Sequence, residues 1–465
     1  MSVFHASIFA LIAWHSLLLA PGAPTDPDSG ILAIQHVTVV DVEAGKSLPD
    51  RTVLVRDGTI AAIGPAGSVP IPEEAARLSG RGRWLIPGLW DMHVHVTDAT
   101  ALALPALVAH GVTGVRDAGG DLVAIDAWRR AIASGELAGP RIVRPGPYVD
   151  GYKPDAPFRL TVEDADDARA AVAYVQARGA DYVKIHNAVP REAYFALAGE
   201  SRERGIPFAG HVPLDVSPGE AARAGQASLE HAVTIFEGTF RELLPPDPEA
   251  QMRTLAAFVA SGADTLAARL RAEGTAVTPT LAPTVLRGRR VELADDPPAC
   301  ADLVARSLRE QWDRFFPVTE RDRAPGVEAL RARFADLMIG FTGVLHAAGV
   351  PLLAGSDLGA RDVCPGVALH DELAHLVGAG LEPLDALRAA TIVPARFLGA
   401  SDSLGSVATG KRADLVLLEA DPLADIGNTR RIFAVIADGK RYDRGALDAI
   451  LADVRRRAAE EGAGR

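Results

Sequence analysis

Two histidines, His93 and His95, stand one residue apart at the end of an apolar run that begins at Trp84. If residues 85–96 form a β-strand, side chains alternate between its faces and both imidazoles point the same way. Neutral imidazole binds zinc and related divalent ions, and ligands on a rigid strand lose little conformational freedom when metal binds. The pair alone is a weak signal, because a metal site needs three or four ligands.

Further residues that could complete such a site each follow a short apolar run later in the chain. They are Lys184, His211, His231 and Asp357. Any one of these residues could simply be hydrogen-bonded in a loop, but together they form a chemically coherent set. A lysine ammonium, however, has no lone pair to give and repels a cation.

The elements that would bring these residues together alternate between short apolar strands and amphipathic helices over residues 84–399. The candidate strands are 85–96, 112–117, 141–143, 182–186, 207–211, 228–232, 277–281 and 351–357. Strands that alternate with helices indicate a parallel sheet, and eight of them can close a barrel. We therefore predict an α/β fold with a (β/α)8 TIM-type barrel. In such a barrel the reacting groups lie where strands end, so all six candidate ligands would share one rim.

Short strands at both ends of the chain predict a second, smaller unit. Residues 31–83 contain alternating strands with an Asp57-Gly58 hairpin signal, and residues 400–445 repeat this pattern. Neither half has enough strands for its own core, so we expect them to pair into one β-sandwich. Residues 446–465 would form a C-terminal helical tail.

Two long insertions, 236–274 and 284–348, interrupt the barrel pattern. The second contains an amphipathic helix whose apolar stripe comprises Val327, Leu330, Phe334, Leu337, Met338 and Phe341. We expect this stripe to pack against the outer helices of the barrel. The alternative is a lid that helps to choose the substrate, with Trp312, Phe315 and Phe316 as candidate contacts.

Composition and charge limit the kinds of molecule that the protein could bind. The 465 residues carry a net charge of −12 with scattered basic residues, which argues against nucleic acid or an anionic membrane and favours a small-molecule partner. Two cysteines are too few for a disulfide framework. Residues 1–24 resemble a signal peptide, too short to span a membrane, which favours a secreted or periplasmic protein over a cytoplasmic one. Oligomerisation stays possible.

The ordered set of His93-Val94-His95, Lys184, His211, His231 and Asp357 resembles that of the amidohydrolase superfamily. Residues 111–120, 389–399 and 404–415 are also similar to segments of its imidazolonepropionase-like branch, which includes Xaa-Pro dipeptidases. The resemblance covers about residues 34–444 and implies a (β/α)8 barrel with a flanking β-sandwich.

By this resemblance, two divalent metal ions, with zinc first among them, would be bound. His93, His95 and Asp357 would hold one ion, and His211 and His231 the other. Lys184 would react with carbon dioxide, and its carbamate would bridge the two ions. The alternative is a mononuclear site with an unmodified, salt-bridged Lys184. A metal-bridging hydroxide would attack the substrate, with Asp357 as base and then acid.

The predicted function is metal-dependent hydrolysis of an amide-type C–N bond, with a dipeptidase or prolidase-like activity as the leading candidate. Alternatives are a hydrolase of a cyclic amide, lactone or amine, and a catalytically silent binding protein. Candidate substrate contacts are His186, Arg116, Tyr152, Lys153 and Arg361, which stand on or just after strand ends. His186 could instead make a structural hydrogen bond, and Arg116 could be a buried ion-pair partner. His370 and His375 stand five residues apart, too far around a helix to share a metal.

Overall fold

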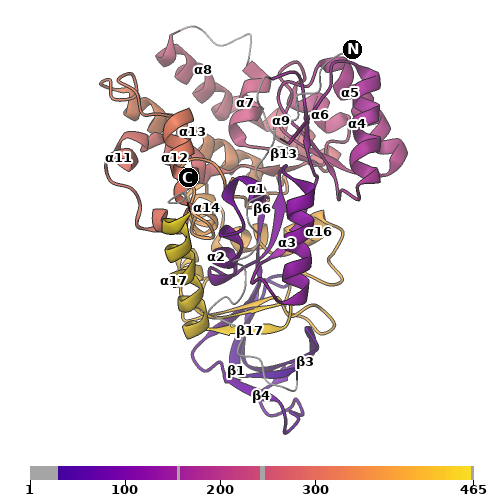
Figure 1. Cartoon of the computed structure of the whole chain (residues 1–465), viewed down its shortest axis with the longest axis vertical. Coiled ribbons are helices and arrows are strands. Elements are labelled where there is room, and N and C mark those ends of the chain that lie inside the picture. The colour runs from indigo at the N-terminus through magenta and orange to yellow at the C-terminus, as the bar shows by residue number, and fades with distance from the viewer. Residues whose placement is uncertain (1–29, 154–157, 241–246, 462–465) are drawn as a thin grey trace.

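The computed structural model describes residues 30–153, 158–240 and 247–461. The predicted signal peptide, 1–24, lies outside this range. Figure 1 shows a helix-rich part at the top and a sheet at the bottom, where indigo and yellow strands from the two ends of the chain lie together. The order of elements is that of a (β/α)8 barrel inserted between two halves of a smaller sheet unit, as predicted.

The smaller unit is one eight-stranded sheet in the order β17-β16-β15-β5-β1-β2-β3, with β4 paired to β1. Its strands are β1 (Ile31–Asp41), β2 (Lys46–Arg56), β3 (Thr59–Pro65), β4 (Ala76–Ser79), β5 (Trp84–Pro87), β15 (Leu415–Leu418), β16 (Ile432–Ala437) and β17 (Lys440–Asp443). The predicted hairpin at Asp57 and Gly58 joins β2 to β3, and both residues have positive φ, as a tight hairpin turn requires. The sheet carries its own apolar cluster, which includes Ile34, Leu85 and Ile436.

The barrel strands are β6 (Leu89–Val94), β7 (Val112–Asp117), β8 (Arg141–Val143), β9 (Tyr148–Asp150), β11 (Val183–Ile185), β12 (Phe208–Gly210), β13 (Ser228–Glu230) and β14 (Ala276–Thr278). A short outer strand, β10 (Arg159–Thr161), pairs with β9. The third barrel strand is interrupted, so that β8 pairs with β7 and β9 with β11. The predicted eighth strand is represented by bridges from Leu352 to Val277 and from Leu358 to Val94. These bridges connect the last strand segment to both neighbours.

The predicted strand 85–96 is wrong as a single element, because the chain changes sheets at Gly88. Residues before it pair with β15 in the smaller unit, and those after it pair with β7 in the barrel. A Cβ at Gly88 would stand 2.0 Å from Oγ1 of Thr113. Only glycine therefore allows the close approach at which the chain passes from one sheet to the other.

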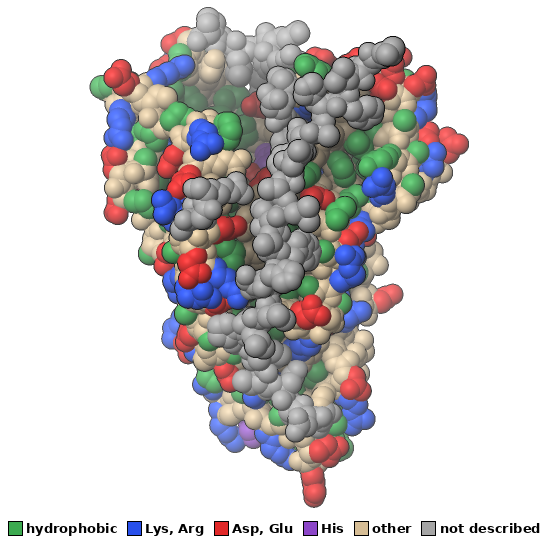
Figure 2. Space-filling view, in the orientation of Figure 1, with side chains coloured by type: hydrophobic (Ala, Val, Ile, Leu, Met, Phe, Trp, Pro, Cys, Tyr) green, Lys and Arg blue, Asp and Glu red, His purple; other side chains and the backbone are tan. Residues whose placement is uncertain are grey.

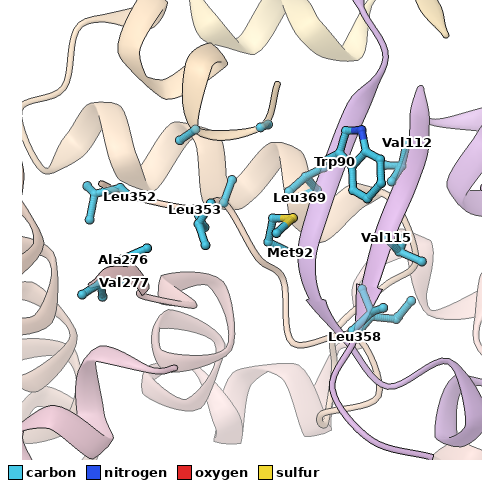
Figure 3. Packing of buried hydrophobic residues seen from close by; sticks show 14 of the residues in the cluster. Trp90, Met92, Val112, Val115, Ala276, Val277, Leu352, Leu353, Leu358 and Leu369 are labelled. Carbon is cyan, nitrogen blue, oxygen red and sulfur yellow. The ribbon is translucent and has the colours of Figure 1, made fainter. Parts of the chain in front are cut away.

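Helices cover the barrel. They are α1 (Val96–Ala99), α2 (Ala103–Ala109), α3 (Leu122–Ser134), α4 (Ala165–Ala177), α5 (Arg191–Arg204), α6 (Pro218–Arg223), α7 (Ala232–Phe240), α14 (Val367–Gly378), α15 (Pro383–Ala389), α16 (Ile392–Phe397) and α17 (Arg444–Glu460). Figure 3 shows Trp90 and Met92 of β6 near Val112 of β7 and Leu369 of α14. Side chains alternate along β6, so Asp91 and His93 point to the opposite side from these apolar residues.

The insertions are helical. The first contains α8 (Pro248–Ser261) and α9 (Ala263–Glu273), and the second contains α10 (Leu281–Gly288), α11 (Arg290–Asp295), α12 (Arg306–Phe315) and α13 (Val327–Ala347). Met338 and Phe341 of α13 are fully buried in the main core, which confirms the predicted packing of this helix. A disulfide between Cys300 and Cys364 ties the second insertion to the loop after Asp357. The sequence alone did not indicate this pairing.

In the parts of the chain that the structure describes, no helix is both long and apolar enough to cross a membrane. Figure 2 shows acidic and basic side chains interspersed over the face that it draws.

Candidate metal centre

Three of the predicted ligands form a compact group. Ligand atoms of His93, His95 and Asp357 all lie within 4.8 Å of one another. The Nε2 atoms of His93 and His95 lie 3.4 and 3.5 Å from Oδ1 of Asp357. His93 belongs to β6 and His95 immediately precedes α1, whereas Asp357 lies in the eighth strand segment. The bridge between Val94 and Leu358 brings these distant parts of the chain together.

His93 is held in place by a buried carboxylate. Its Nδ1 donates to Oε2 of Glu230 at 2.8 Å, and Oε1 of Glu230 accepts from Arg116 at 2.7 Å and from Ser228. Burial raises the pKa of Glu230, but Arg116 and His93 outweigh this effect and hold it well below its ordinary value. The carboxylate therefore fixes the tautomer of His93 and leaves Nε2 for a ligand. Sequence reasoning missed Glu230, although it directly precedes His231 at the end of a strand.

His211 and His231 continue the group. The ring centroid of His231 lies 4.5 Å from that of His93 and 4.7 Å from that of His211. Nδ1 of His231 lies 2.8 Å from Oγ1 of Thr280, while Nδ1 of His211 is buried without a hydrogen-bond partner in the described part of the chain. The three imidazoles therefore form one continuous cluster across β6, β12 and β13.

Lys184 of β11 lies in the wall of the same cavity and is 2% exposed. Its Nζ has no hydrogen-bond partner among the described residues. Burial lowers the pKa of this amine to about 8, and the charge of Arg116 acts in the same direction. A buried lysine nitrogen without a partner is costly, so this position favours either the neutral amine or a chemically modified one.

Backbone strain is concentrated at this end of the barrel. His231, Thr280 and Asp357 have φ values of 63°, 48° and 56°. Left-handed conformations are uncommon for residues other than glycine and persist only where the surrounding structure imposes them. The fold thus imposes uncommon backbone conformations on two predicted ligands and on the threonine that contacts one of them.

The protonation states of three histidines suit cation binding, whereas for His95 the effect of burial is outweighed by the hydrogen bond and the charge of Asp357, which raise its pKa. Burial lowers the pKa of His231 to about 4 and moves the pKa values of His93 and His211 well below the ordinary value. These imidazoles are therefore neutral near pH 7 and retain lone pairs for a metal. Burial also disfavours ionisation of Asp357, but the neighbouring histidines, His231 first, keep its pKa far below the usual range. Asp357 is accordingly a carboxylate.

This donor set fits divalent metal ions. Imidazole nitrogens and a carboxylate converge, and three buried nitrogens at the site have no hydrogen-bond partner among the residues that the structure describes: Nε2 of His93, Nζ of Lys184 and Nδ1 of His211. Unsatisfied polar atoms are rare in native interiors unless a ligand or water satisfies them. Imidazole and carboxylate ligands are compatible with zinc and with other divalent transition metals.

Two more buried acidic side chains, Asp91 and Asp117, bind the backbone next to the predicted ligands. Asp91 accepts from the backbone N–H of Ser356 and His93, and Asp117 accepts from the N–H of Val96. Burial raises the pKa of Asp91 to about 7 and that of Asp117 to about 6. Their bonds fix the backbone on either side of the predicted ligands. Sequence reasoning gave neither residue a role.

A cavity of about 500 Å³ opens over the cluster. Five predicted ligands line it, namely His95, Lys184, His211, His231 and Asp357. Trp312 and Phe316 of the second insertion also line it, as the lid alternative expected, whereas Phe315 does not and is 63% exposed. The volume is within the usual range for small-molecule sites.

Three predicted substrate contacts, Arg116, Tyr152 and Lys153, do not line the cavity. Arg116 is 2% exposed and donates to the carbonyl oxygen of Met92, to Ser228, to Glu230 and to Thr278. All these contacts lie inside the barrel, so Arg116 has the alternative role of a buried ion-pair partner. Tyr152 is 73% exposed and does not line the cavity. Strand-end position alone could not separate residues that face the cavity from those that face the protein.

The other two, His186 and Arg361, do line the cavity. Nδ1 of His186 donates to Oδ1 of Asn187 at 2.9 Å, and its ring lies 4.0 Å from that of His211. The predicted structural hydrogen bond and a position at the cavity therefore coexist. Lys153 pairs with Asp150 at 3.0 Å, and Arg361 pairs with Asp313 at 2.8 Å, so both cations already have carboxylate partners.

Comparisons with known proteins agree with this arrangement. A model of the Amidohydrolase family matches residues 84–442. An imidazolonepropionase of Micrococcus luteus is 30% identical over 427 residues, which cover 84% of this chain and 92% of that protein. The structure of a bottromycin amidohydrolase has a TM-score of 0.73 at 27% identity, covering 92% and 91% of the two chains. A structure described as a candidate prolidase from Bifidobacterium longum has a TM-score of 0.67 at 25% identity, covering 91% and 98%.

Proposed function

The chain belongs to the amidohydrolase family, and on that premise we propose that it hydrolyses amide-type C–N bonds with dipeptides or prolidase-type substrates as its first candidates. The observation that carries this proposal is the convergence of His93, His95 and Asp357 with His211, His231 and Lys184 around one cavity. The buried nitrogens without protein partners support metal binding there. The complete ligand set argues against a catalytically silent barrel.

The proposed ligands divide into two groups. His93, His95 and Asp357 would hold one divalent ion, and His211 and His231 would hold a second. Zinc is our first candidate for both, because zinc accepts imidazole and carboxylate ligands. A bound pair of such ions would supply an activated water near neutral pH and would polarise the substrate carbonyl.

The protein's own contribution to the reaction is proton transfer and positioning. Asp357 is a carboxylate within 3.5 Å of both His93 and His95. It would accept a proton from the attacking water and donate it to the nitrogen of the leaving amine. Glu230 orients the His93 ring through Nδ1. The apolar wall that includes Trp312 would limit access of bulk water.

We also propose that Lys184 becomes a carbamate. Its neutral amine nitrogen would bond to the carbon of carbon dioxide and release one proton, so that a neutral amine would become an anionic carbamate. The buried Nζ without a hydrogen-bond partner supports this step. Activity that depends on bicarbonate and is lost in Lys184→Ala is expected. Metal content unchanged in that variant would contradict the bridging role.

A cyclic amide is the second candidate substrate class. The observation that favours it is the 30% identity to an imidazolonepropionase over most of both chains. Dipeptides and cyclic amides differ in charge at their ends, so one assay can separate them. We would screen zinc-loaded protein against dipeptides, N-acyl amino acids and lactams.

Asp357→Asn is the matched catalytic control in this screen. We expect the wild type to hydrolyse at least one amide class. The rate should fall at least a hundredfold in this variant, since general acid–base groups contribute about 10²–10⁴-fold. No hydrolysis of any class by the zinc-loaded wild type, or equal rates in both proteins, would contradict the proposal.

The disulfide supports a place outside the cytosol. Cys300 and Cys364 are bonded, and structural disulfides persist mainly in oxidising compartments. We propose export to the periplasm or the medium. The check is fractionation of the native host followed by thiol alkylation: protein in the exported fraction with both cysteines blocked from alkylation is expected, and reduced protein in the cytosol would contradict it.

A further inference from the structure

One face of the second insertion borders the cavity directly. Four residues of α10 and the start of α11 line it: Pro283, Leu286, Arg287 and Arg290. The last three follow Pro283 by three, four and seven positions. This is the spacing of residues that share one side of a helix. The face is apolar near the start of α10 and carries two arginines farther along.

The arginines at this cavity differ in what already binds them. Arg361 pairs with Asp313, and Arg290 donates to the carbonyl oxygens of Phe316 and Pro317. Within residues 30–153, 158–240 and 247–461, Arg287 donates no hydrogen bond and forms no ion pair. Arg287 is exposed and its charge acts on Glu237 of α7, but with no hydrogen bond to a described residue its guanidinium donors remain available at the cavity.

The start of α10 is anchored to the candidate metal centre. Thr280, the residue before the helix, lies 2.8 Å from Nδ1 of His231 through its hydroxyl. Arg287 follows seven residues later, which corresponds to about 10 Å along a helix axis. An extended peptide covers that distance in about three residues. A group bound by Arg287 would thus lie about three residues beyond the scissile amide, and not at it.

Apolar side chains occupy the wall between these two points and opposite them. Leu286, Leu308, Trp312 and Phe316 all line the cavity. Nε1 of Trp312 donates to the carbonyl oxygen of Gly359 at 3.1 Å, which fixes the indole. A fixed indole and a phenyl ring offer surface to an apolar or aromatic segment of a ligand.

We propose that Arg287 binds a carboxylate of the substrate, and that the enzyme selects amides whose anionic end lies beyond an apolar, preferably aromatic, segment. This inference rests on the proposed function, because it names the substrate class of the same site. A guanidinium binds a carboxylate through two parallel hydrogen bonds, which makes the contact strong and directional. The carboxylate would supply the partner that Arg287 lacks.

The test compares two probes that differ only in charge, N-acetyl-glycyl-L-phenylalanyl-glycine and its C-terminal carboxamide, in which the terminal group lies three residues beyond the acetyl–glycyl amide and past an aromatic residue. Kinetic constants for hydrolysis would be measured on the zinc-loaded wild type, Arg287→Ala and Arg289→Ala, and Kd would be measured by calorimetry with each protein also carrying Asp357→Asn. Arg289 is the matched control, because it is the neighbouring arginine but pairs with Glu292 at 2.6 Å and does not line the cavity.

We expect the wild type to prefer the carboxylate probe and Arg287→Ala to bind it about ten- to hundredfold more weakly, the usual loss for a charge-assisted hydrogen bond. The loss should appear in KM, with the carboxamide and Arg289→Ala unaffected. Equal affinity of the wild type for both probes, or equal losses in the two arginine variants, would overturn the proposal. If neither probe is hydrolysed but the binding preference depends on Arg287, the anion site stands and the hydrolase proposal is the part that fails.

Discussion

Glu230→Gln isolates the electrostatic support beneath His93. The substitution keeps the shape of the side chain but removes the charge that Arg116 and His93 both contact. Both side chains of the Arg116–Glu230 pair are almost completely buried, with exposures of 2% and 1%. A neutral amide would leave the Arg116 guanidinium inside the barrel without a counter-charge.

The expected cost follows from this burial. Breaking a buried ion pair by changing one partner costs about 3–5 kcal/mol, because the remaining charge stays desolvated. A glutamine can still accept one hydrogen bond from Arg116, so we expect the lower part of that range. The same change loosens the His93 ring, and loss of such an orienting partner weakens metal binding by about 10–100-fold.

Urea unfolding of metal-free protein and competition with a zinc chelator would measure the two effects separately. Glu220→Gln is the matched control, since Glu220 also pairs with an arginine, Arg191, but with side chains 27% and 50% exposed. Exposed pairs contribute at most about 1 kcal/mol. A loss in Glu230→Gln no larger than that in Glu220→Gln, together with unchanged zinc affinity, would refute the reasoning.

Three further predictions concern pH, the disulfide and the metal. Burial lowers the pKa of His370 to about 3, so between pH 6.5 and 3 only the unfolded state binds a proton at this residue. The free energy of unfolding should therefore fall as the pH drops through that window. In His370→Gln the fall should be shallower by roughly 1 kcal/mol per pH unit, and identical urea titrations at pH 7 and 5 would contradict this prediction. Cys364→Ser should lower the free energy of unfolding by about 2–4 kcal/mol, measured by urea unfolding against reduced wild type, which should match the variant. Chelation should lower Tm, and added zinc should raise it again with the logarithm of the zinc concentration, whereas a Tm independent of zinc would argue against a resident metal.

Much of the fold followed from local patterns. Alternating strands and helices predicted the barrel. The matching strand patterns at both ends predicted a β-sandwich, where the structure has one eight-stranded sheet built from both ends of the chain. The rule that reactive groups follow barrel strands selected residues that the structure brings together, such as His93, His211 and His231. The fold class could be predicted because burial of strands leaves a strong apolar signature, and a charged residue or a histidine differs clearly from it.

The rest depended on three-dimensional packing. Arg116 and Arg361 both lie on or beyond strand ends, yet one faces Glu230 inside the barrel and the other borders the cavity. Whether a side chain has a partner is decided by residues far away in the chain, as with the Cys300–Cys364 bond. For the same reason the sequence did not predict a role for Arg287. Only the structure shows that it lines the cavity without a hydrogen bond to a described residue.

Metal analysis tests the central claim most directly. Protein reconstituted with zinc, freed of excess ion and analysed by inductively coupled plasma mass spectrometry should hold about two equivalents of zinc per chain, as expected for two ligand groups on one barrel. His211→Ala should retain about one. Less than one equivalent in the wild type, or equal zinc content in the wild type and in a variant that lacks His93, His95 and His211, would contradict the account.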